Sequence, residues 1–508
     1  MTAVSETDVG ATALPRDRPG ARGVDAARIS DFLDSVADNR LELHGLMIYR
    51  AGAVVAEGFW NPYASRYPHM LHSAVKSWTG TAVGLAIGDG LLRLDDKVID
   101  FFPEHLPSVV SDNLAAMTVK DLLTMRSGHN TGSSGGEWRA LRESWVSLFL
   151  REDLTERPGQ EFIYSSGSSY MLSAIVTKVT GKTVHALLDE RLFRPLGCGS
   201  VTWDISPEGY STGGNGLSCT LEDMLKFGVL YLHDGMWNGK RLLPVGWVAE
   251  ATRNHVRDIW MGPLDGRRFL ARNASPGAAL QKRDDYGFQW WITPHGGYRA
   301  NGLFGQYLIV LPERDAVIAI NAAVPYGETG LADAVWRHLL PALDGPPSDQ
   351  ATESRLADQL GRLELPMPVG GPRSGIEATV NGRTFQMEPN EDGVKEIRFD
   401  FSADCCRFTL TDGRGTHAVT VGLAGAVESD TTMTGARLHH TYEPDSLHVV
   451  ATGTWLDQAS FNMVWRFVET AFCDTVLCRF DGGRLRLDRR VNVNPGGTER
   501  PTITGQLV

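Results

Sequence analysis

The feature that most constrains the fold is the order of strand-like and helix-like segments between residues 44 and 323. Residues 44–60 read as two short strands joined by a glycine-containing turn. The segments that follow have helical periodicity, and three strand-like runs close the region, at residues 286–294, 305–313 and 316–323. Strands at both ends with helices between them predict an α+β fold, in which the two ends share one antiparallel sheet flanked by helices and an all-helical region.

Length and composition predict a second domain. The 508 residues exceed what one hydrophobic core usually organises, and Gly, Pro, Ser and Asp cluster near residue 346. Strand-like runs separated by turn residues follow, beginning at 376–380 and including 436–442, and they predict an all-β barrel or sandwich. We expect these four parts: a flexible N-terminal tail (1–24), an α+β domain (25–345), a linker (346–375) and a β-rich domain (376–508).

Charge and hydropathy exclude several classes of function. A formal net charge of −12 argues against a nucleic-acid partner, because binding phosphates needs a concentrated basic surface. No window offers the roughly 18 apolar residues of a membrane span, and residues 1–24 lack the apolar core of a secretory signal. We therefore expect a cytoplasmic protein without a membrane partner.

The six cysteines are expected to be buried thiols, since a long cytosolic chain needs no disulfide framework. Cys473 and Cys478 could be joined or hold a metal, but no companion His or Cys pair stands at ligand spacing. The chain has no zinc-protease, Walker or dinucleotide motif in the context that each requires. No metal or other cofactor is implied.

Ser73 and Lys76 form the only Ser-x-x-Lys pattern in the chain, where a loop gives way to a helix. Residues three apart on a helix share a face, so the amine of Lys76 can reach the hydroxyl of Ser73. A desolvated lysine can be neutral and act as a general base for a serine nucleophile. The pattern is loose, and an ordinary surface helix is the alternative.

Tyr164 stands just before a second helical run, in the segment Phe162-Ile163-Tyr164-Ser165-Ser166-Gly167. It does not lie within an apolar stripe, so it is a candidate functional residue. A buried structural tyrosine is the alternative.

These blocks resemble, in sequence and order, the β-lactamase-like, penicillin-recognising family of serine hydrolases over residues 40 to 325. The chain is most similar to the branch of 6-aminohexanoate-dimer hydrolases and carboxylesterases, whose third motif reads Ala-x-Gly-x-x-Gly-Gln, here residues 300–306. The resemblance implies that Ser73, Lys76 and Tyr164 are catalytic and that the backbone N–H groups of Ser73 and Leu303 form an oxyanion hole. It implies substrate-site roles for these further residues: Ser166, Ala300, Asn301, Gly302 and Gly305.

Two positions depart from the penicillin-binding pattern. That branch usually carries Lys-Thr-Gly or His-x-Gly at the third motif, and Ala300 cannot supply a cation. His295, in His295-Gly296-Gly297, is a rival match and stays a substrate-site candidate, although the spacing to Gly305 favours Ala300. Ser166 replaces the more usual Asn of the second motif. Both departures argue against recognition of a β-lactam.

Residues 132–136 match Gly-x-Ser-x-Gly, the nucleophile elbow of another hydrolase fold. That motif needs a strand before it and a helix after it, and the sequence shows no strand leading in. We expect a flexible loop near the substrate here.

The resemblance implies a serine hydrolase that forms an acyl-Ser73 intermediate from an ester or amide, or transfers the acyl group to another acceptor. The alternatives are a D-amino-acid-directed peptidase or β-lactamase and, in another class, a non-catalytic receptor that binds a ligand in the same fold. The expected partner is a small-molecule or peptide-like substrate. The β-rich domain resembles lipocalin-like barrels and could bind a ligand, mediate a homodimer or stabilise the fold.

Overall fold

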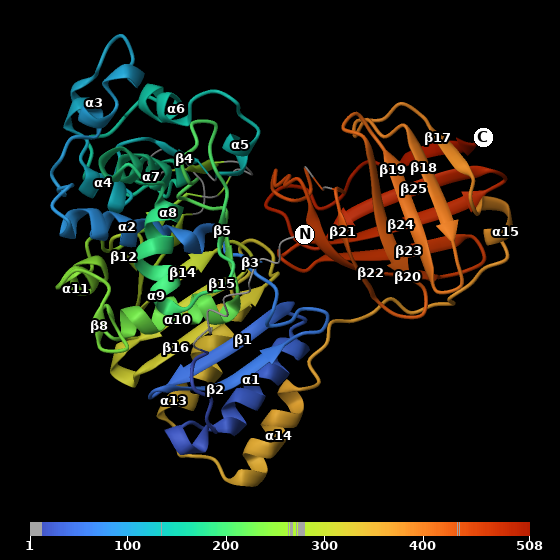
Figure 1. Cartoon of the computed structure of the whole chain (residues 1–508), viewed down its shortest axis with the longest axis horizontal. Helices are drawn as coiled ribbons and strands as arrows, with labels where there is room; N and C mark the ends of the chain where they lie inside the picture. The colour runs from blue at the N-terminus through green and yellow to red at the C-terminus, as the bar shows by residue number, and fades with distance from the viewer. Residues whose placement is uncertain are drawn as a thin grey trace, which may run out of the picture. The chain divides into compact units, whose positions relative to one another are not determined.

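The chain folds into two compact units in a computed structural model that describes residues 13–133, 135–262, 264, 268–270, 272, 280–433, 435 and 437–508. Unit 1 consists of Met1–Phe59, Ala64–Ala322 and Thr329–Leu363. Unit 2 consists of Trp60–Tyr63, Ala323–Glu328 and Glu364–Val508. The colours of Figure 1 follow the chain from the blue and green elements of unit 1 to the orange and red barrel of unit 2.

Unit 1 is built on one antiparallel sheet with the strand order β12-β13-β14-β15-β16-β1-β2. The first two strands pair directly with the last, since Met47 of β1 lies opposite Ala319 of β16. The prediction that both ends of this region share a sheet is therefore confirmed. The strands are β1 (Leu43–Arg50), β2 (Ala53–Phe59), β12 (Asp285–Tyr286), β13 (Trp291–Thr293), β14 (Gly297–Gly302), β15 (Gln306–Leu311) and β16 (Ala316–Ala322).

Helix α10 (Leu221–Leu232) covers the sheet over β15, β16 and β1. Thr220 caps its N-terminus, accepting from the N–H of Asp223. A Cβ on Gly228 would lie 2.6 Å from Val317 and 2.7 Å from Leu308, so glycine lets this helix approach the sheet closely.

The helical region of unit 1 centres on α2 (Lys76–Gly88) and α7 (Ser166–Thr180), which pack against each other (Figure 1). Helix α2 is buried from Lys76 to Ala86, which explains its run of small and apolar residues. A Cβ on Gly84 would lie 2.2 Å from the Trp247 ring. The side chains of Ser77 and Thr79 donate to the carbonyls of Gln289 and Gly213, both at 2.7 Å, and so tie two loops to this helix.

The other described helices of this unit surround these layers. They are α1 (Ala26–Asp38), α3 (Asp112–Ala116), α4 (Val119–Leu123), α5 (Gly136–Arg139), α6 (Trp145–Arg151), α8 (Val184–Leu188), α9 (Arg194–Leu196), α11 (Trp247–Ala251), α12 (Gly330–Ala334), α13 (Leu340–Asp344) and α14 (Gln350–Leu360). Short strands outside the main sheet are β3 (His69–Met70), β4 (Thr131–Ser133), β5 (Thr202–Trp203), β6 (Leu217–Cys219), β7 (Met236–Trp237), β8 (Lys240–Arg241), β9 (Trp260–Met261), β10 (Arg268–Leu270) and β11 (Gln281–Lys282).

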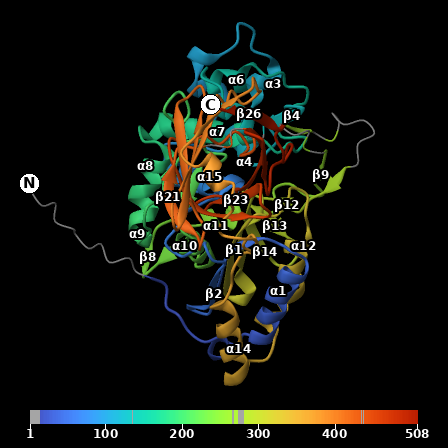
Figure 2. The ribbon, with the colours of Figure 1, turned by 90° about the vertical axis from the view of Figure 1, so that its right-hand side faces the viewer.

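The expected linker, residues 346–375, contains helix α14. Asp349 caps this helix through the N–H of Thr352, and Leu356 is buried. Figure 2 shows α14 beside α1, against which it packs. In the expected tail, Leu14 and Val24 are buried, and the N–H of Leu14 donates to Glu222 at 2.7 Å. Both segments therefore contribute to unit 1 within the described residues.

Unit 2 is the predicted β-barrel. In its described residues the strand order is β20-β19-β18-β17-β26-β25-β24-β23-β22-β21, and a parallel pairing of β20 with β22 closes nine strands into a barrel. Side chains alternate between a buried and a more exposed face along β18 and β19, as a filled barrel requires. The strands are β17 (Thr384–Met387), β18 (Glu396–Phe401), β19 (Cys405–Thr411), β20 (Thr416–Gly422), β21 (Val427–Thr431), β22 (Leu447–Trp455), β23 (Ser460–Phe467), β24 (Cys473–Asp481), β25 (Arg484–Val491) and β26 (Ile503–Leu507).

Two runs that we expected to be strands are not. Residues 377–380 form the short helix α15 (Glu377–Val380), which follows a turn in which the N–H of Ser374 donates to the Glu377 carboxylate at 3.0 Å. Residues 437–441 form a turn whose His439 is buried and contacts Asp474 at 2.8 Å. Residue 436 lies outside the described residues.

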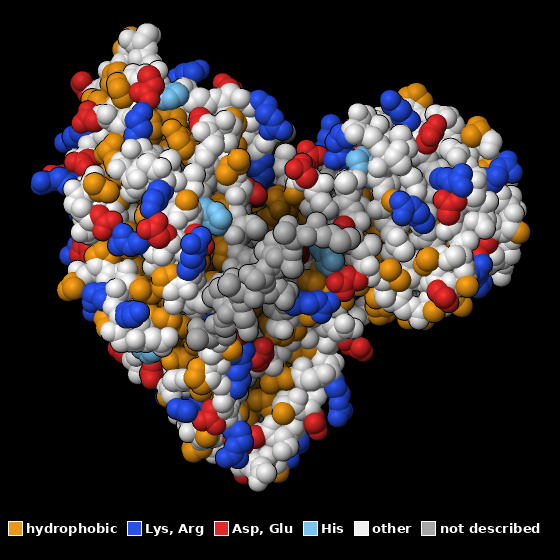
Figure 3. Space-filling model, in the orientation of Figure 1, with side chains coloured by type: hydrophobic (Ala, Val, Ile, Leu, Met, Phe, Trp, Pro, Cys, Tyr) orange, Lys and Arg blue, Asp and Glu red, His pale blue; other side chains and the backbone are white. Residues whose placement is uncertain are grey.

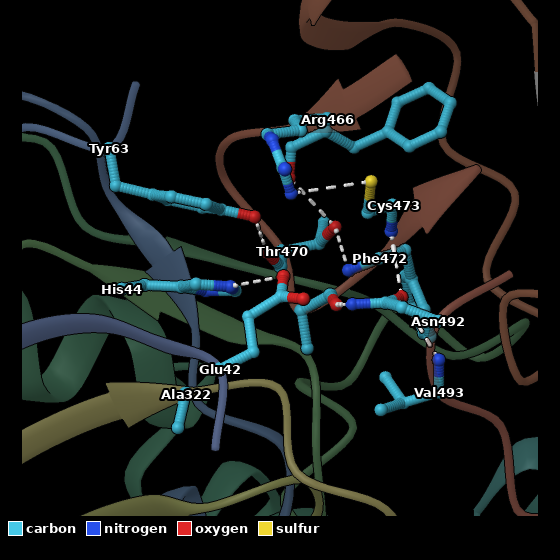
Figure 4. A network of polar contacts seen from close by, with 12 residues as sticks. Glu42, His44, Tyr63, Ala322, Arg466, Thr470, Phe472, Cys473, Asn492 and Val493 are labelled. Atoms are coloured by element: carbon cyan, nitrogen blue, oxygen red, sulfur yellow. Dashed lines mark hydrogen bonds and ion pairs between the residues drawn. The ribbon is translucent and has the colours of Figure 1, made fainter. Parts of the chain in front are cut away.

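The turn between β23 and β24 is held by side-chain hydrogen bonds (Figure 4). Asn492 accepts from the N–H of Cys473 at 2.9 Å and donates to the carbonyl of Ala471 at 3.0 Å. Thr470 accepts from the N–H of Phe472 at 3.0 Å. These contacts fix the end of the barrel at which β24 begins.

The six cysteines are all free thiols, so Cys473 and Cys478 are not joined. Four are buried as expected, whereas Cys198 and Cys405 are only half-buried. No helix in the described ranges is both long and apolar enough to span a membrane. Acidic and basic side chains are interspersed on the face shown in Figure 3.

Candidate active site

Ser73 lies in a tight turn between a strand and a buried helix. Strand β3 pairs with β6, and the 3-10 helix η2 (His72–Val75) follows it and leads directly into α2. His72, immediately before Ser73, has a φ of 48°, a conformation that side-chain-bearing residues rarely adopt. Ser73 is half-buried, whereas the residues on either side of it are buried. In this turn, therefore, only the serine is partly exposed to solvent.

Lys76 places its amine against the hydroxyl of Ser73. The distance from Nζ to the Ser73 Oγ is 3.0 Å, as the spacing of three residues predicts. Nζ also lies 3.1 Å from the Ser166 Oγ and donates to the carbonyl oxygen of Gly214 at 2.7 Å. The lysine is only 2% exposed.

Burial lowers the pKa of Lys76 to about 7, because the charged form loses its hydration. None of its three polar contacts is with a carboxylate. A neutral amine has two N–H donors and one lone pair. If it donates to the Gly214 carbonyl and to Ser166, its lone pair is left to accept from the Ser73 hydroxyl. The contacts therefore suit a base that removes the serine proton.

Tyr164 lies one residue before Ser165, the N-cap of α7, as predicted. Its ring stacks on Trp291 at 5.6 Å between centroids and meets Phe269 edge-on at 5.1 Å. The Lys76 Nζ lies 4.9 Å from the centroid of the Tyr164 ring. The fold thus brings Tyr164 together with Lys76 and, through Lys76, with Ser73.

Ser166 opens α7 and contacts Lys76 from the side opposite α2. It is 4% exposed. A Cβ on Gly214 would lie 2.8 Å from the Ser166 Cβ, so glycine is required for the loop of residues 213–216 to approach this helix. The three groups around Nζ therefore come from η2, α7 and this loop.

Asn215 is a candidate site residue that sequence reasoning missed. A Cβ on Gly135 would lie 2.1 Å from the Asn215 Nδ2 and 3.3 Å from the Ser166 Oγ, so the amide and the hydroxyl border the same space. The Asn215 Oδ1 is buried and makes no hydrogen bond within the part of the chain that the structure describes. The signal available in the sequence was the Gly213-Gly214-Asn215-Gly216 run, in which a polar residue stands among glycines.

The turn between β14 and β15 packs against the Ser73 turn. A Cβ on Gly302 would lie 2.2 Å from the carbonyl oxygen of Leu71, and the Phe304 ring meets the His72 ring edge-on at 5.2 Å. Gln306 is fully buried and donates to the carbonyls of Leu303 at 3.2 Å and Ala322 at 2.7 Å. This amide holds the Leu303 peptide in place beside η2.

Ala300, Asn301 and Gly305 share this part of the sheet with Gly302. Ala300 is buried and lies opposite Leu308 in the register of β14 and β15. Asn301 is half-buried and lies opposite Tyr307, and its Oδ1 makes no hydrogen bond to a described residue. Gly305, with a φ of 91°, donates to the carbonyl of Gly302 at 3.3 Å and closes the turn.

His295 is not brought to this site. It precedes β14, whereas Gly302 ends that strand, so the two lie at opposite ends of β14. Its ring packs against Trp336, with 4.5 Å between centroids. The alignment of the third motif on Ala300 therefore agrees with the geometry, and the rival alignment on His295 does not.

The loop that matches Gly-x-Ser-x-Gly does have a strand leading into it, contrary to our expectation. Strand β4, which pairs with β10, includes the first two residues of the motif, and α5 begins at its last glycine. Ser134, the central serine of the motif, lies outside the described residues. The neighbouring Ser133 has a structural role, since its Oγ accepts from the N–H of Gly167 at 2.8 Å in the first turn of α7.

Comparison with known proteins agrees with this geometry. The chain is 28% identical over 368 residues to the 6-aminohexanoate-dimer hydrolase of Paenarthrobacter ureafaciens, covering 67% of this chain and 88% of that protein. It is 27% identical over 215 residues to the esterase EstB of Burkholderia gladioli, covering 36% of this chain and 55% of that protein.

A solved structure from Bacillus anthracis, provisionally identified as a 6-aminohexanoate-dimer hydrolase, shares the fold. Its TM-score is 0.51 at 19% identity, and the match covers 65% of this chain and 87% of that chain. The model of the family described as Beta-lactamase matches residues 33–342. These residues carry both the sheet and the Ser73 turn, and they make up more than half of the chain. The resemblance found in the sequence is confirmed, and the chain belongs to the beta-lactamase family.

Proposed function

We propose that this protein is a serine hydrolase that acts on a small-molecule or peptide-like ester or amide through an acyl-Ser73 intermediate. The observation that carries the proposal is the 3.0 Å contact between the Ser73 Oγ and the Nζ of a lysine whose pKa is lowered by burial to about 7. A serine hydroxyl is a weak nucleophile unless a base removes its proton, and here that base is Lys76.

In the first step, the Ser73 oxygen forms a bond to the substrate carbonyl carbon while its proton moves to the Lys76 Nζ. The carbonyl oxygen gains negative charge and needs hydrogen-bond donors. The N–H groups of Ser73 and Leu303 suit this role, because neither donates to another group among the described residues. Each donor in such a site typically stabilises the transition state by about 3 kcal/mol.

In the second step, the bond between the carbonyl carbon and the leaving group breaks, and the leaving oxygen or nitrogen takes up the proton. Lys76 holds that proton after the first step, and Tyr164 beside it is the proposed path to the leaving group. A water molecule then attacks the acyl-Ser73 carbon, with the same pair removing its proton. An alcohol or amine in place of water would make the reaction an acyl transfer.

The charges near the third motif favour a substrate without a carboxylate anchor. Ala300 is apolar, and Arg299 beside it pairs with Asp284 at 2.9 Å. Neither offers an unpaired cation of the kind that a penicillin-binding site uses. We therefore place simple esters and amides ahead of β-lactams and D-amino-acid peptides. Two matched relatives, a 6-aminohexanoate-dimer hydrolase and an esterase, are consistent with this choice.

The test compares p-nitrophenyl butyrate with butyryl p-nitroanilide, which share an acyl group and differ in the bond that breaks. Turnover of the ester by the wild type, reduced at least a thousandfold in Ser73→Ala, is expected from a nucleophile of this kind. Ser168→Ala is the matched control, because that serine lies on α7 and makes no hydrogen bond to a described residue. Equal turnover by the wild type and Ser73→Ala would overturn the proposal.

A further inference from the structure

A short strand from a later part of the chain lies beside Tyr164. Strand β10 pairs with β4, and Phe269 of β10 lies directly opposite Gly132. A Cβ on Gly132 would lie 2.0 Å from the carbonyl oxygen of Tyr164, so this face of the two-stranded ribbon packs against the Tyr164 main chain. Residues directly opposite each other in a sheet share a face. The Phe269 side chain is therefore on the Tyr164 side of the ribbon.

The Phe269 ring adds an aromatic surface to the site. Its centroid lies 5.1 Å from that of the Tyr164 ring with the ring planes at 85°, the edge-to-face arrangement that aromatic pairs favour. Tyr164 and Trp291, which stack on each other, are both buried, whereas Phe269 is only half-buried. Phe269 therefore presents apolar surface beside Tyr164 that a bound substrate can cover.

The surroundings of Phe269 are apolar. Met261 of β9 and Tyr286 of β12 belong to the same buried cluster as Tyr164 and Trp291, and Phe269 packs against this cluster. Every buried member of the cluster is an aromatic, aliphatic or methionine side chain. A group that binds against Phe269 would therefore gain from the burial of apolar surface rather than from an ion pair.

Arg268 fixes the position of β10. Its Nε lies 3.2 Å from Glu137 of α5, its Nη2 lies 3.0 Å from Glu152, which follows α6, and its Nη1 donates to the Thr131 hydroxyl of β4 at 3.2 Å. A planar guanidinium can serve three such partners at once, which a lysine amine at the same place cannot do in the same geometry. Side chains alternate along a strand, so these contacts lie on the face of β10 opposite to Phe269.

We propose that Phe269 is a specificity-determining residue that receives an aromatic ring on the leaving group, and that Arg268 is the positioning residue that holds Phe269 beside Tyr164. The inference rests on the proposed function, in which Tyr164 passes a proton to the leaving group, because a surface beside Tyr164 then lies beside the leaving group. It names the substrate class as esters and amides of an apolar alcohol or amine that carries a ring.

Two pairs of esters test the proposal. Benzyl butyrate and ethyl butyrate form the same acyl-Ser73 and differ by a ring on the leaving group. Ethyl hydrocinnamate and ethyl butyrate share the leaving group and differ by a ring on the acyl group. The values of kcat/KM include recognition of both parts of the substrate. The wild type is expected to favour benzyl butyrate over ethyl butyrate at least tenfold, as apolar pockets discriminate by about this factor.

Phe269→Ala should lower the ratio of kcat/KM for benzyl butyrate to that for ethyl butyrate about tenfold, mainly through a higher KM for benzyl butyrate. The ratio for the acyl pair should stay unchanged. Leu270→Ala is the matched control, because Leu270 is the next residue of β10, is also half-buried and lies on the opposite face. Both ratios should stay at their wild-type values in this control.

Arg268→Gln should lower the benzyl-to-ethyl ratio as Phe269→Ala does, although the Phe269 ring remains. Added to Phe269→Ala, it should lower the ratio no further, because Arg268 acts through Phe269. Arg253→Gln is its control and should keep the wild-type ratio, since it breaks an exposed ion pair with Glu250 at 2.6 Å. A purely structural role of Arg268 would instead lower kcat/KM for both esters equally and contradict its role as a positioning residue.

The outcomes separate this inference from the proposed function. Ester turnover with the same benzyl-to-ethyl ratio in the wild type, Phe269→Ala and Arg268→Gln would overturn the role of Phe269 and leave the acyl-Ser73 mechanism standing. A change in Phe269→Ala that follows the acyl pair would do the same. No turnover of any of these esters by the wild type would contradict both.

Discussion

The Nζ of Lys76 lies 3.0 Å from the Oγ of Ser73, and its other contacts are with the Ser166 hydroxyl, the Gly214 carbonyl and the face of the Tyr164 ring. None of these contacts is with a carboxylate. Lysine is normally charged at neutral pH, and burial lowers its pKa. The burial of α2 is therefore as necessary for a basic amine as the lysine itself.

The pH dependence of ester hydrolysis should report the titration of Lys76. The pKa of this residue is lowered to about 7, and only the neutral amine can accept the serine proton. We therefore expect kcat/KM to rise with pH and to level off above a midpoint near 7. Initial rates with p-nitrophenyl butyrate from pH 5.5 to 9 measure this. A flat profile over that range would contradict the role of Lys76 as the base.

Replacing Lys76 should stabilise the fold while abolishing activity. A lysine whose pKa is lower in the folded state than in the unfolded state lowers the free energy of unfolding. This loss is complete below about pH 7, where the lysine is charged in both states, and it disappears as the pH approaches the ordinary pKa of 10.5. Lys76→Met should therefore raise Tm by several degrees at pH 7, with a smaller gain at pH 10. Scanning calorimetry at both pH values measures the difference.

Lys226→Met is the matched control for that substitution. Lys226 is also buried, but it has a carboxylate partner, Asp223, at 3.4 Å. Its loss would leave Asp223 buried without a cation, so Tm should fall. A lower Tm in Lys76→Met as well would mean that Lys76 is a structural lysine.

Ser166 should contribute to catalysis through its contact with Lys76. Ser166→Ala removes one of the three groups around Nζ and should lower kcat about tenfold, a loss comparable to one hydrogen bond. Ser168→Ala lies on the same buried helix without a hydrogen bond to a described residue and should keep the wild-type kcat. Steady-state kinetics on the two variants distinguish the roles, and equal losses would show a general effect on α7.

The turn after β14 should control the geometry of the Ser73 turn. In Gly302→Ala the new Cβ would lie 2.2 Å from the carbonyl oxygen of Leu71, pushing η2 away from the Leu303 peptide. A displacement of this size can cost about a hundredfold in kcat.

Gly297→Ala provides a control at the other end of the same strand. Its Cβ would lie 2.3 Å from the carbonyl oxygen of Val310, so the two variants should lose similar stability. Only Gly302→Ala should lose most of its activity. If kcat falls equally in both, the effect of Gly302 is general and the proposed oxyanion hole loses support.

The main sheet could be predicted because its strands and turns are local patterns in the sequence. The hairpin of β1 and β2 and the strands β15 and β16 were found in this way, and the grouping of strands at both ends implied that they pair. Helix α14, inside the expected linker, was not predicted because Asp349, which caps it, belongs to a Pro- and Ser-rich stretch that resembles a loop. Residues 377–380 were expected to be a strand because Thr379 and Val380 favour strands, whereas the turn at Ser374, whose N–H donates to the Glu377 carboxylate, leads into helix α15.

The contact between Ser73 and Lys76 could be predicted from their spacing on a helix, but the group that accepts from Lys76 most closely could not. That acceptor is the carbonyl of Gly214, a main-chain atom 138 positions away, and no side chain marks it. The spacing to Gly305 favours Ala300 over His295 in the sequence, but it leaves His295 as a rival match. The geometry separates them, since only one end of β14 meets η2.

The most direct test of the central claim is intact-protein mass spectrometry after exposure to a fluorophosphonate, with wild type beside Ser73→Ala and Ser168→Ala. We expect one adduct on the wild type and on Ser168→Ala, none on Ser73→Ala, and peptide mapping that assigns the label to Ser73. Labelling of Ser73→Ala to the same extent as the wild type, or no labelling of the wild type, would contradict the assignment of Ser73 as the nucleophile.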